Sequence, residues 1–426
     1  MISQAEGPAA ASEASRLPIW KDTVFWFVIA FGLGYGAVYN FLPATFPVFK
    51  REFASSLAQM GQVQFLYFLS GLAFSLVGGS AIALLGLKSS ALGALGLVAS
   101  ALLLIAEARN FNLVLIAAAI FGFAIAGTVV ISSSIVTAHF RQHRQSIFFL
   151  TGLSDAGGSM IGPALLGWWL VRADQTDVSW RLGYLAAVGG LALLVLWTLL
   201  MRSDQMEGPN ISRPMPIAVL SQARDVLTSG ALYIAVVLGF CHGLAHAGMF
   251  SFVGQLFIHK LHIDAARAAY FISVNAGGIL AGRTLFSWIS SRWKIPELVV
   301  ITVCAAVETM AFLGCIFAPS YAAGMLMFIL AGIFVSSIGP SLNSYLGGKF
   351  PERAPTAFSL FAGLSNVGAA IGPFLIGKIG NRFGVEKAIL FGPAFSAVLS
   401  GLALVWFLRE RMYAAHVARY ASALPR

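Results

Sequence analysis

The chain has 426 residues, of which 58% are hydrophobic and only 10% are charged, and its mean hydropathy is +0.83. A composition this apolar excludes a water-soluble globular domain and predicts an integral membrane protein. The formal net charge of +10 would also suit a nucleic-acid-binding protein. The basic residues lie in short segments between apolar runs, however, so we expect no nucleic-acid partner and attribute the charge to membrane topology.

Twelve apolar runs are long enough to cross about 30 Å of hydrocarbon as helices. They are 24–46, 62–85, 91–108, 111–138, 147–171, 182–201, 231–258, 266–290, 298–317, 321–346, 357–379 and 387–408. The sequence therefore predicts an all-α integral membrane fold in three parts. An N-terminal six-helix bundle with a short tail (1–201) is followed by a cytoplasmic linker (202–229) and a C-terminal six-helix bundle with its own tail (230–426).

The two halves share a sequence element. Residues 140–167 read FRQHRQSIFFLTGLSDAGGSMIGPALLG, and residues 350–377 repeat most of these landmarks at an offset of 210. The repeated pairs include Gly158/Gly368, Gly162/Gly372 and Pro163/Pro373. A period this long excludes a solenoid and predicts two pseudo-symmetric six-helix bundles.

The distribution of Lys and Arg predicts the orientation of the chain. An even number of spans places both termini on one side of the membrane, and that side holds 16 Lys and Arg residues against 10 on the other. The positive-inside rule then favours cytoplasmic termini. The first nineteen residues lack the basic flank and apolar run of a signal peptide, so we expect a cytoplasmic tail and an inner (plasma) membrane location.

Two six-helix halves, a central inner loop and a repeated glycine–proline element together resemble the major facilitator superfamily over essentially the whole chain. In the fifth span, residues 158–167 (GSMIGPALLG) look like that family's antiporter-type glycine–proline motif. The glycines allow close helix packing and the proline frees a carbonyl group, so Gly158, Gly162, Pro163, Gly372 and Pro373 are candidate gating residues. Because the element recurs in the eleventh span, a packing role without ion coupling stays open.

The family's best-known signature, in the loop after the second span, is only partly present. Gly79, Gly86 and Lys88 are in register, but Ala83 and Leu84 replace the acidic and basic residues that normally lock the inner gate. The span-four arginine pattern of drug/proton antiporters is absent from 111–138. The first departure argues against a standard inner latch, and the second argues against a multidrug exporter.

Ionisable residues inside spans are the strongest functional signal, since each costs about 2.5–3.5 kcal/mol at mid-membrane on insertion scales. They are Asp155, His242, His246, Arg283 and Glu308. Asp155 and Arg283 lie at similar depths on the fifth and eighth spans, which face each other in the resembled family. We therefore expect them to pair across the interface and to act in gating or coupling. The alternative is that Arg283 extends to the surface and Asp155 is a protonated packing residue.

Residues of the cavity-lining spans form the candidate substrate site. In the resembled family, spans one, four, seven and ten line a central cavity, and we add Arg283 of span eight because its charge favours an organic anion. The candidates are Tyr35, Tyr39, Asn40, Ser133, His242, His246, Arg283 and Asn343. His242 and His246 share a helical face at i, i+4 and could carry protons or bind substrate. Two histidines with Cys241 are too few for a metal site, so we expect no metal.

Glu308 is expected at the periphery, because the resembled family places span nine there. A neutral, protonated carboxyl bonded to a neighbouring helix is the simplest interpretation.

No phosphate-binding GxxxxGK[ST] sequence and no constellation for hydrolysis or group transfer occur, so we predict no enzymatic activity and no cofactor. The resemblance implies a monomeric secondary transporter that moves a small organic solute by alternating access. Arg283 and the histidines favour an organic anion such as a carboxylate, coupled to protons. The alternatives are a proton-driven exporter of lipophilic drugs or metabolites and a non-transporting membrane sensor on a transporter fold.

Overall fold

The computed structural model describes residues 19–140, 144–176, 178–207, 228–350 and 354–423, and the elements in these ranges are helical. The first half contains η2 (Ile19–Lys21), α2 (Thr23–Tyr39), α3 (Phe41–Phe53), α4 (Leu57–Leu85), α5 (Leu87–Ala106), α6 (Phe111–His139), α7 (Arg144–Thr176), α8 (Arg181–Leu200) and α9 (Ser203–Glu207). The second contains α11 (Gly230–Leu261), α12 (Ala265–Arg292), α13 (Glu297–Ile316), α14 (Tyr321–Val335), α15 (Ile338–Lys349), α16 (Ala354–Phe383), α17 (Val385–Ala388) and α18 (Phe391–Ala423).

The described helices make twelve membrane-length segments, which confirms the predicted all-α fold. Three of the segments are interrupted: α2 and α3 meet at Asn40, α14 and α15 at Ser336–Ser337, and α17 and α18 at 389–390. In the described chain, ten stretches are both long and apolar enough to be membrane spans by composition. The other two segments, α7 and α12, are long enough, but their polar and glycine residues lower their hydropathy. These two helices carry Asp155 and Arg283.

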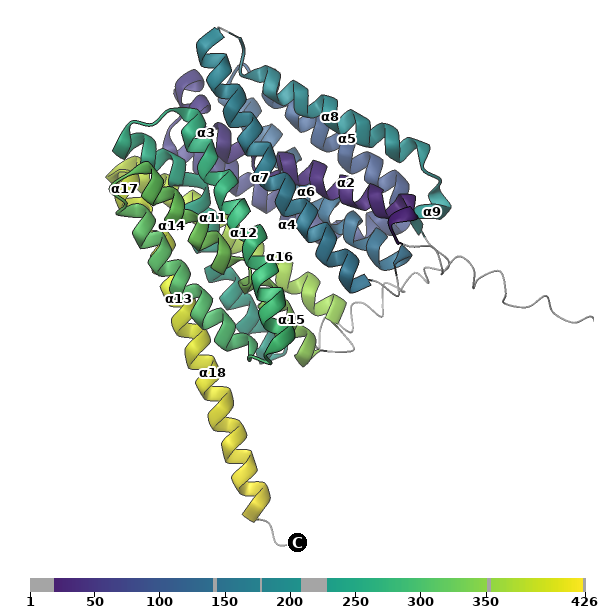
Figure 1. The fold of residues 1–426 in the computed structure, drawn as a ribbon, viewed down its shortest axis with the longest axis vertical. Helices are drawn as coiled ribbons and strands as arrows, with labels where there is room; N and C mark the ends of the chain where they lie inside the picture. Colours follow the sequence, from purple (N-terminus) through teal and green to yellow (C-terminus); the bar gives the residue numbers. More distant parts are fainter. Residues whose placement is uncertain (1–18, 141–143, 177, 208–227, 351–353, 424–426) are drawn as a thin grey trace, which may run out of the picture.

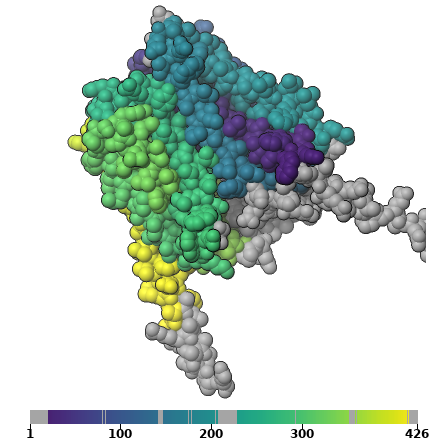
Figure 2. Space-filling model, viewed as in Figure 1, coloured from purple at the N-terminus to yellow at the C-terminus, as the bar shows by residue number. Residues whose placement is uncertain are grey.

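The helices pack as two bundles related by pseudo-symmetry (Figure 1). In the first bundle α2 packs on α7, α4 on α6, and α5 on α8; in the second, α11 packs on α16, α12 on α14, and α13 on α18. The bundles meet through α4 against α16 and α7 against α12, so these contacts obey the same symmetry. Figure 2 shows the bundles as two masses, purple to teal and green to yellow, that join along one boundary. Most of the predicted linker, 208–227, lies outside the described residues.

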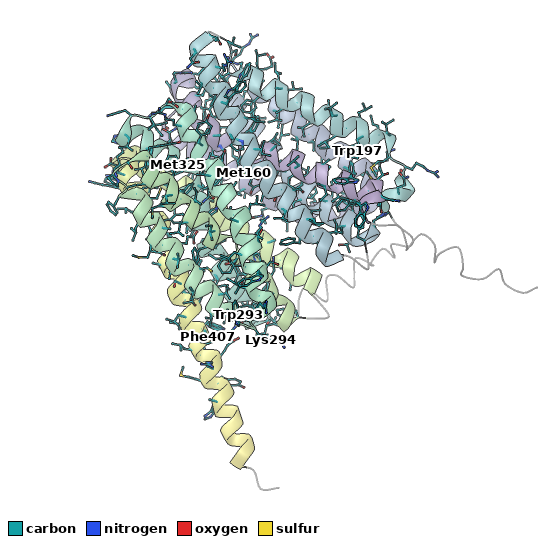
Figure 3. All side chains as sticks on the ribbon, in the orientation of Figure 1. Met160, Trp197, Trp293, Lys294, Met325 and Phe407 are labelled. Atoms are coloured by element: carbon teal, nitrogen blue, oxygen red, sulfur yellow. The ribbon has the colours of Figure 1, made fainter. Side chains whose placement is uncertain are left out.

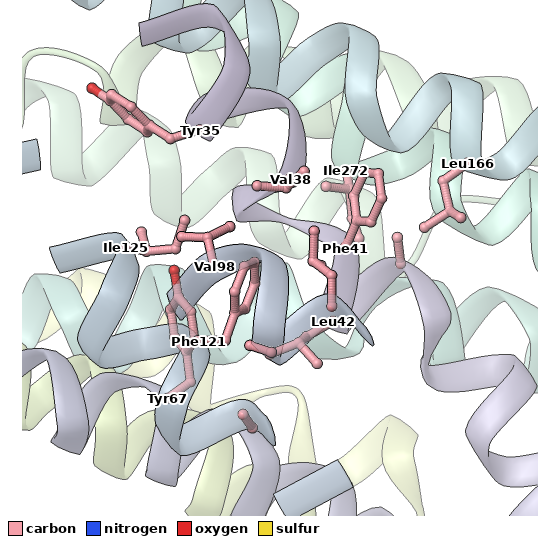
Figure 4. Packing of buried hydrophobic residues seen from close by; sticks show 14 of the residues in the cluster. Tyr35, Val38, Phe41, Leu42, Tyr67, Val98, Phe121, Ile125, Leu166 and Ile272 are labelled. Atoms are coloured by element: carbon pink, nitrogen blue, oxygen red, sulfur yellow. The ribbon is translucent and has the colours of Figure 1, made fainter. Parts of the chain in front are cut away.

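The contact between the bundles is strongest at one end. We call the end where α2 begins and α15 ends the terminal face, and the end where α3 ends and α12 begins the distal face. Towards the distal face, the rings of Phe46 and Phe252 are 6.0 Å apart and those of Phe65 and Phe374 are 5.4 Å apart. The apolar residues of α3 and α12 interdigitate there, with Phe41 beside Ile272 (Figure 4).

Towards the terminal face the C-terminal bundle has a core of its own. Its members come only from α11, α13, α14, α15, α16 and α18 and include Leu232, Leu298 and Leu342. The ribbon correspondingly converges near α3 and spreads apart towards α9 and α15 (Figure 1). Leu84, at the terminal end of α4, is 81% exposed. The bundles are therefore joined at the distal face and separate towards the terminal face.

The repeated glycines explain how α7 and α16 approach their partners. A Cβ atom on Gly162 would overlap the carbonyl oxygen of Ala37 on α2, and one on Gly372 would collide with the carbonyl oxygen of Leu244 on α11. Gly158 is in the same position against the carbonyl oxygen of Leu33. Glycine at these positions lets two backbones touch, which is how helices associate in a lipid environment. The repeat thus encodes the same close helix pair in both bundles.

Candidate functional site

The first group of candidate residues lies where the two bundles meet, and we call Tyr35, Asp155 and Arg283 the interface cluster. Gly36 of α2 lies directly against the backbone of Asp155 on α7, and Ser159 donates a hydrogen bond of 3.3 Å to the carbonyl oxygen of Gly36. Asp155 and Arg283 are each within electrostatic range of the Tyr35 hydroxyl. The close α2–α7 contact therefore brings a carboxyl group, a phenol and a guanidinium together from three helices.

Arg283 crosses from one bundle to the other. Its Nη1 atom donates a hydrogen bond of 2.7 Å to the carbonyl oxygen of Gly152 on α7, one turn before Asp155. Nearer the distal face, Met160 of α7 lies against Gly277 of α12, close to the centre of the molecule in Figure 3. The two helices are thus in contact along several turns.

The expected direct ion pair between Asp155 and Arg283 is not formed in this structure. The two groups interact electrostatically, but among the described residues no carboxylate oxygen lies within 4.0 Å of the Arg283 guanidinium. The physical reason is that the guanidinium reaches the Gly152 carbonyl instead, one turn towards the terminal face. An arginine has five N–H donors, so most of its donor capacity stays open towards a ligand.

The two tyrosines of α2 are four residues apart and so share a face of the helix, but their rings have different neighbours. Tyr35 is buried and its ring packs edge-on against Phe31, while Tyr39 packs edge-on against Tyr67 of α4 at 6.0 Å. Asn40 is buried at the break between α2 and α3. Tyr39 thus links α2 to α4, and Asn40 lies nearer the distal face than the interface cluster.

Two other predicted substrate residues, Ser133 and Asn343, have no contact with the interface cluster among the described interactions. The hydroxyl of Ser133 donates to the carbonyl oxygen of Val129, one turn earlier on α6, at 2.9 Å. Asn343 is exposed on α15, towards the terminal face. The structure brings neither of them into contact with the interface cluster.

The two histidines belong to a second group, formed by His242, His246, Glu308 and Ser396, which we call the histidine–glutamate cluster. The rings of His242 and His246 are stacked, with centroids 5.9 Å apart and planes inclined by 12°. His246 Nδ1 lies 3.7 Å from Oε1 of Glu308 on α13. On the other side of the carboxyl group, Ser396 of α18 donates a hydrogen bond of 2.7 Å to Oε2.

This second cluster reaches from a partly exposed residue to a fully buried one. The His246 side chain is 20% exposed, whereas Glu308 is 0% exposed. Glu308 Oε1 and the Nδ1 atoms of His242 and His246 have no hydrogen-bond partner among the described residues. Nearby, the hydroxyl of Ser337 lies 3.0 Å from Sγ of Cys304, a free and buried cysteine. No group of three or more His, Cys, Asp or Glu side chains in the described chain could hold a metal ion.

The sequence did not place Glu308 correctly. We expected it at the periphery, bonded to a neighbouring helix. Ser396 of α18 does bond to it, but the carboxyl group also faces span seven, where it interacts with His246. One signal was available: Glu308 and His246 both lie near the middle of their spans in the same half, and depth was the criterion that associated Asp155 with Arg283. Depth alone could not say which faces of α11 and α13 point at each other.

Three polar residues have structural partners that the sequence did not reveal. Lys88 donates to the carbonyl oxygens of Leu199 and Met201 at the end of α8, at 3.0 and 2.6 Å. Asn275, which is fully buried, donates to the carbonyl oxygen of Phe328 on α14 at 2.9 Å. These hydrogen bonds hold helices together within each bundle.

The third of these polar residues, Asp22, lies at the terminal face. Asp22 caps the N-terminus of α2 through the backbone N–H of Val24 and lies 2.7 Å from Nε2 of His139. Burial alone would raise the pKa of the Asp22 carboxyl, but its hydrogen bonds to His139 and Val24 lower it below the usual value. The pair ties the first and fourth spans together.

Comparison with known proteins gives a consistent picture. A family model described as Major Facilitator Superfamily matches residues 24–313. Among solved structures, the chain is similar to the E. coli fucose:proton symporter FucP, with a TM-score of 0.62 and 19% identity, covering 89% of this chain and 98% of that one.

Two further solved structures have the same fold. The nucleoside transporter NupG gives a TM-score of 0.72 and 16% identity, with 89% of this chain and 98% of that chain covered. A bacterial homologue of the human lysosomal transporter Spinster, in an inward-facing and unoccupied conformation, gives 0.72 and 14%, with 89% and 95% covered. At these identities the likeness is one of fold.

Proposed function

Because the chain belongs to the major facilitator superfamily, and is thus a multi-pass membrane transporter, we propose that it moves a small organic anion such as a carboxylate, coupled to protons, by alternating access. The substrate binds between the two bundles at the interface cluster. Tyr35, Tyr39 and Asn40 line its site from α2, and His242 and His246 face it from α11. Rocking of one bundle against the other exposes the site to either side in turn.

The observation that carries the proposal is the position of Arg283. Its guanidinium lies between the bundles, half-buried, and donates a hydrogen bond to the backbone carbonyl oxygen of Gly152. A cation held partly away from water without a carboxylate at ion-pair distance is costly, and an anionic ligand would lower that cost. Guanidinium and carboxylate groups also match in geometry, since two parallel N–H···O bonds can form.

Asp155 supplies the gating element of the proposal. It lies within electrostatic range of Arg283 but outside ion-pair distance. A bound anion and Asp155 would compete for the same guanidinium, so binding of one favours release of the other. This competition links occupancy of the site to the α7–α12 contact, where the bundles meet. Gly158, Gly162, Pro163, Gly372 and Pro373 serve the helix packing around it.

The exporter of lipophilic compounds is less well supported. Its main sequence argument was the glycine–proline motif, and those glycines are accounted for by backbone contact in both bundles. A cation between the bundles would also oppose binding of a lipophilic cation. We further propose cytoplasmic termini and an inner-membrane location, on the distribution of Lys and Arg. We also propose a monomeric state, which rests on the family resemblance alone.

The proposal is tested by thermal unfolding of the purified protein in detergent with carboxylates, neutral sugars and lipophilic cations. A ligand that binds only the folded state raises the melting temperature by mass action. We expect a carboxylate to do so. Removing a charge-assisted hydrogen bond worth about 1.5–3 kcal/mol should weaken its binding about 10- to 150-fold in Arg283→Ala.

Two variants serve as controls. Arg283→Lys keeps the charge and should lose less affinity than Arg283→Ala. Arg292→Ala removes an exposed arginine from the terminal end of the same helix and should bind as the wild type does. Hits confined to lipophilic cations, or a carboxylate that binds Arg283→Ala unchanged, would refute the organic-anion proposal.

A further inference from the structure

The histidine–glutamate cluster is separate from the interface cluster in one important respect. Its members come from α11, α13 and α18, which pack on one another within the C-terminal bundle. Its internal distances therefore do not depend on how the two bundles are placed.

The carboxyl group of Glu308 has an unusual environment. It is completely buried, one oxygen accepts a hydrogen bond from Ser396, and the other has no hydrogen-bond partner in the described chain. That second oxygen faces His246 Nδ1 across 3.7 Å, and this nitrogen also has no hydrogen-bond partner among the described residues. Two unsatisfied buried polar atoms that face each other are costly. A proton between them satisfies both, because His246 Nδ1–H can then donate to the carboxylate or Glu308 can carry the proton itself.

Ser396 can hydrogen-bond to the carboxyl group in both protonation states. Its hydroxyl oxygen lies 2.7 Å from Glu308 Oε2 and 3.1 Å from the carbonyl oxygen of Ala305. When Glu308 is ionised, the serine donates to Oε2. When Oε2 carries a proton, the carboxyl group donates to the serine oxygen and the serine donates to Ala305. The site thus has hydrogen bonds ready for either state without movement of a helix.

The remaining groups around Glu308 are few. In the described residues, the titratable groups that interact with it are His246 and His242 of α11 and the thiol of Cys304 on its own helix. From α18 it meets the hydroxyl of Ser396, and the α14–α15 junction contributes Ser337, which bonds to Cys304. Among the described residues, no lysine or arginine lies within ion-pair distance of the Glu308 carboxylate, so we assign a proton as the positive charge at this site.

We propose that His246, Glu308 and Ser396 form the proton-binding site of the transporter. The partly exposed His246 exchanges the proton with the central region, and the buried Glu308 reaches solvent through it. The coupling of this proton to substrate rests on the proposed function above, whereas proton binding itself does not.

Proton binding is tested by infrared difference spectroscopy on the protein in lipid, as the buffer is changed from mildly alkaline to mildly acidic. We expect a carboxylic-acid carbonyl band to grow in the wild type and to disappear in Glu308→Gln. Glu297→Gln is the matched control, because Glu297 also accepts a serine hydrogen bond, at 2.9 Å from Ser344, but lies at the end of α13 without a histidine. Asp155→Asn should likewise keep the band.

Ser396→Ala provides a second and independent readout. Loss of the Ser396 hydroxyl should shift the frequency of the Glu308 band, which a purely structural role of the serine would not do. If Glu308→Gln does not fold, this shift alone tests whether Glu308 binds the proton. A band that survives Glu308→Gln, or that never changes with pH in the wild type, would overturn the proposal, as would an unshifted band in Ser396→Ala.

The coupling arm uses proteoliposomes and a carboxylate that raises the wild-type melting temperature. In Glu308→Gln we expect accumulation driven by a pH gradient to fall to the level of empty liposomes, while counterflow of the carboxylate continues. Accumulation that persists in Glu308→Gln refutes the coupling role of this site. If the thermal screen yields no carboxylate, the proposed function fails by itself, and the infrared result still decides the proton site.

Discussion

Close backbone contact between α2 and α7 makes a quantitative prediction about Gly162. Substitution of Gly162 by alanine places a methyl group on the carbonyl oxygen of Ala37. Because the obstacle is backbone, the two helices must move apart, and no side-chain rotation can relieve the overlap. The neighbouring Gly157 provides a matched control on the same helix, since a Cβ there would lie 3.8 Å from the Leu33 side chain, an ordinary contact distance.

The expected size follows from two opposing effects. Overpacking typically costs about 1–3 kcal/mol, and a backbone obstacle places Gly162→Ala at the upper end of that range. Replacing glycine by alanine inside a helix stabilises the folded protein by about 1 kcal/mol, because alanine has the higher helix propensity. The net loss is about 2 kcal/mol, which corresponds to a melting temperature lower by roughly 4–8 °C for a bundle of this size. Gly157→Ala has only the favourable effect and should melt at the wild-type temperature or slightly above it.

The assay is thermal unfolding in detergent, followed by the loss of a monodisperse peak on size-exclusion chromatography. Gly372→Ala should behave as Gly162→Ala does, because the same contact recurs between α16 and α11. If Gly162→Ala melts with the wild type while Gly157→Ala is destabilised, the α2–α7 backbone contact is not what the glycine provides. The element would then have to be explained by gating instead of packing.

Two further predictions concern residues outside the interface cluster. The pKa of Asp22 is lowered in the folded protein, mainly through His139 against the opposing effect of burial, so its contribution to stability is present at neutral pH and is lost as the pH falls through about 4 and below. Asp22→Asn, which keeps the helix cap, should therefore lower the melting temperature at neutral pH and match the wild type in acid; a difference that persists in acid would contradict this. Asn275→Ala should lose about 1–3 kcal/mol of stability by removing the hydrogen bond to Phe328, with carboxylate affinity unchanged, whereas the exposed Asn343→Ala should not change the melting temperature. A loss of affinity in Asn275→Ala, measured by calorimetry, would instead assign it to the substrate site.

The architecture could be predicted from the sequence because it depends on patterns that are local or periodic. Apolar runs of the right length indicated the spans, and the offset of 210 indicated two equivalent halves. The same repeat also marked the positions where helices touch, since only glycine allows a backbone to approach as closely as Gly162 approaches Ala37. Breaks within spans were not predicted, although Pro43 carried a signal for the break at Asn40: a proline has no N–H and clashes with the carbonyl group four residues earlier, which is that of Tyr39, the last residue of α2.

The sites were predictable only in part. The free-energy cost of placing a charge in a membrane identified the ionisable residues as candidates. Their similar depth in the membrane associated Asp155 with Arg283, and these two residues do lie on helices in contact. The hydrogen bond from Arg283 to Gly152 could not be predicted, because an arginine side chain can reach either a carboxylate or a carbonyl oxygen one turn away. The partner of Glu308 was missed for a related reason. Rotation of α13 about its axis decides whether Glu308 faces lipid or His246, and a span that is apolar on most sides does not reveal its rotation.

The separation of the two clusters matters for how transport could be coupled. The interface cluster is built from both bundles, so Arg283 must part from Gly152 and Asp155 when α7 and α12 separate. The histidine–glutamate cluster is built from one bundle, so the same motion leaves the distance between His246 and Glu308 unchanged and alters only the surroundings of His246. Substrate binding at the interface cluster therefore depends on the relative position of the bundles. Proton binding at the histidine–glutamate cluster depends instead on whether solvent reaches His246. Coupling then requires a link between them, and α11 is placed to provide it, because it carries both histidines and also contacts α3 and α12. Disrupting that contact, for example by enlarging Gly254, which lies against Ala268 of α12, should uncouple proton movement from substrate movement without removing either binding site.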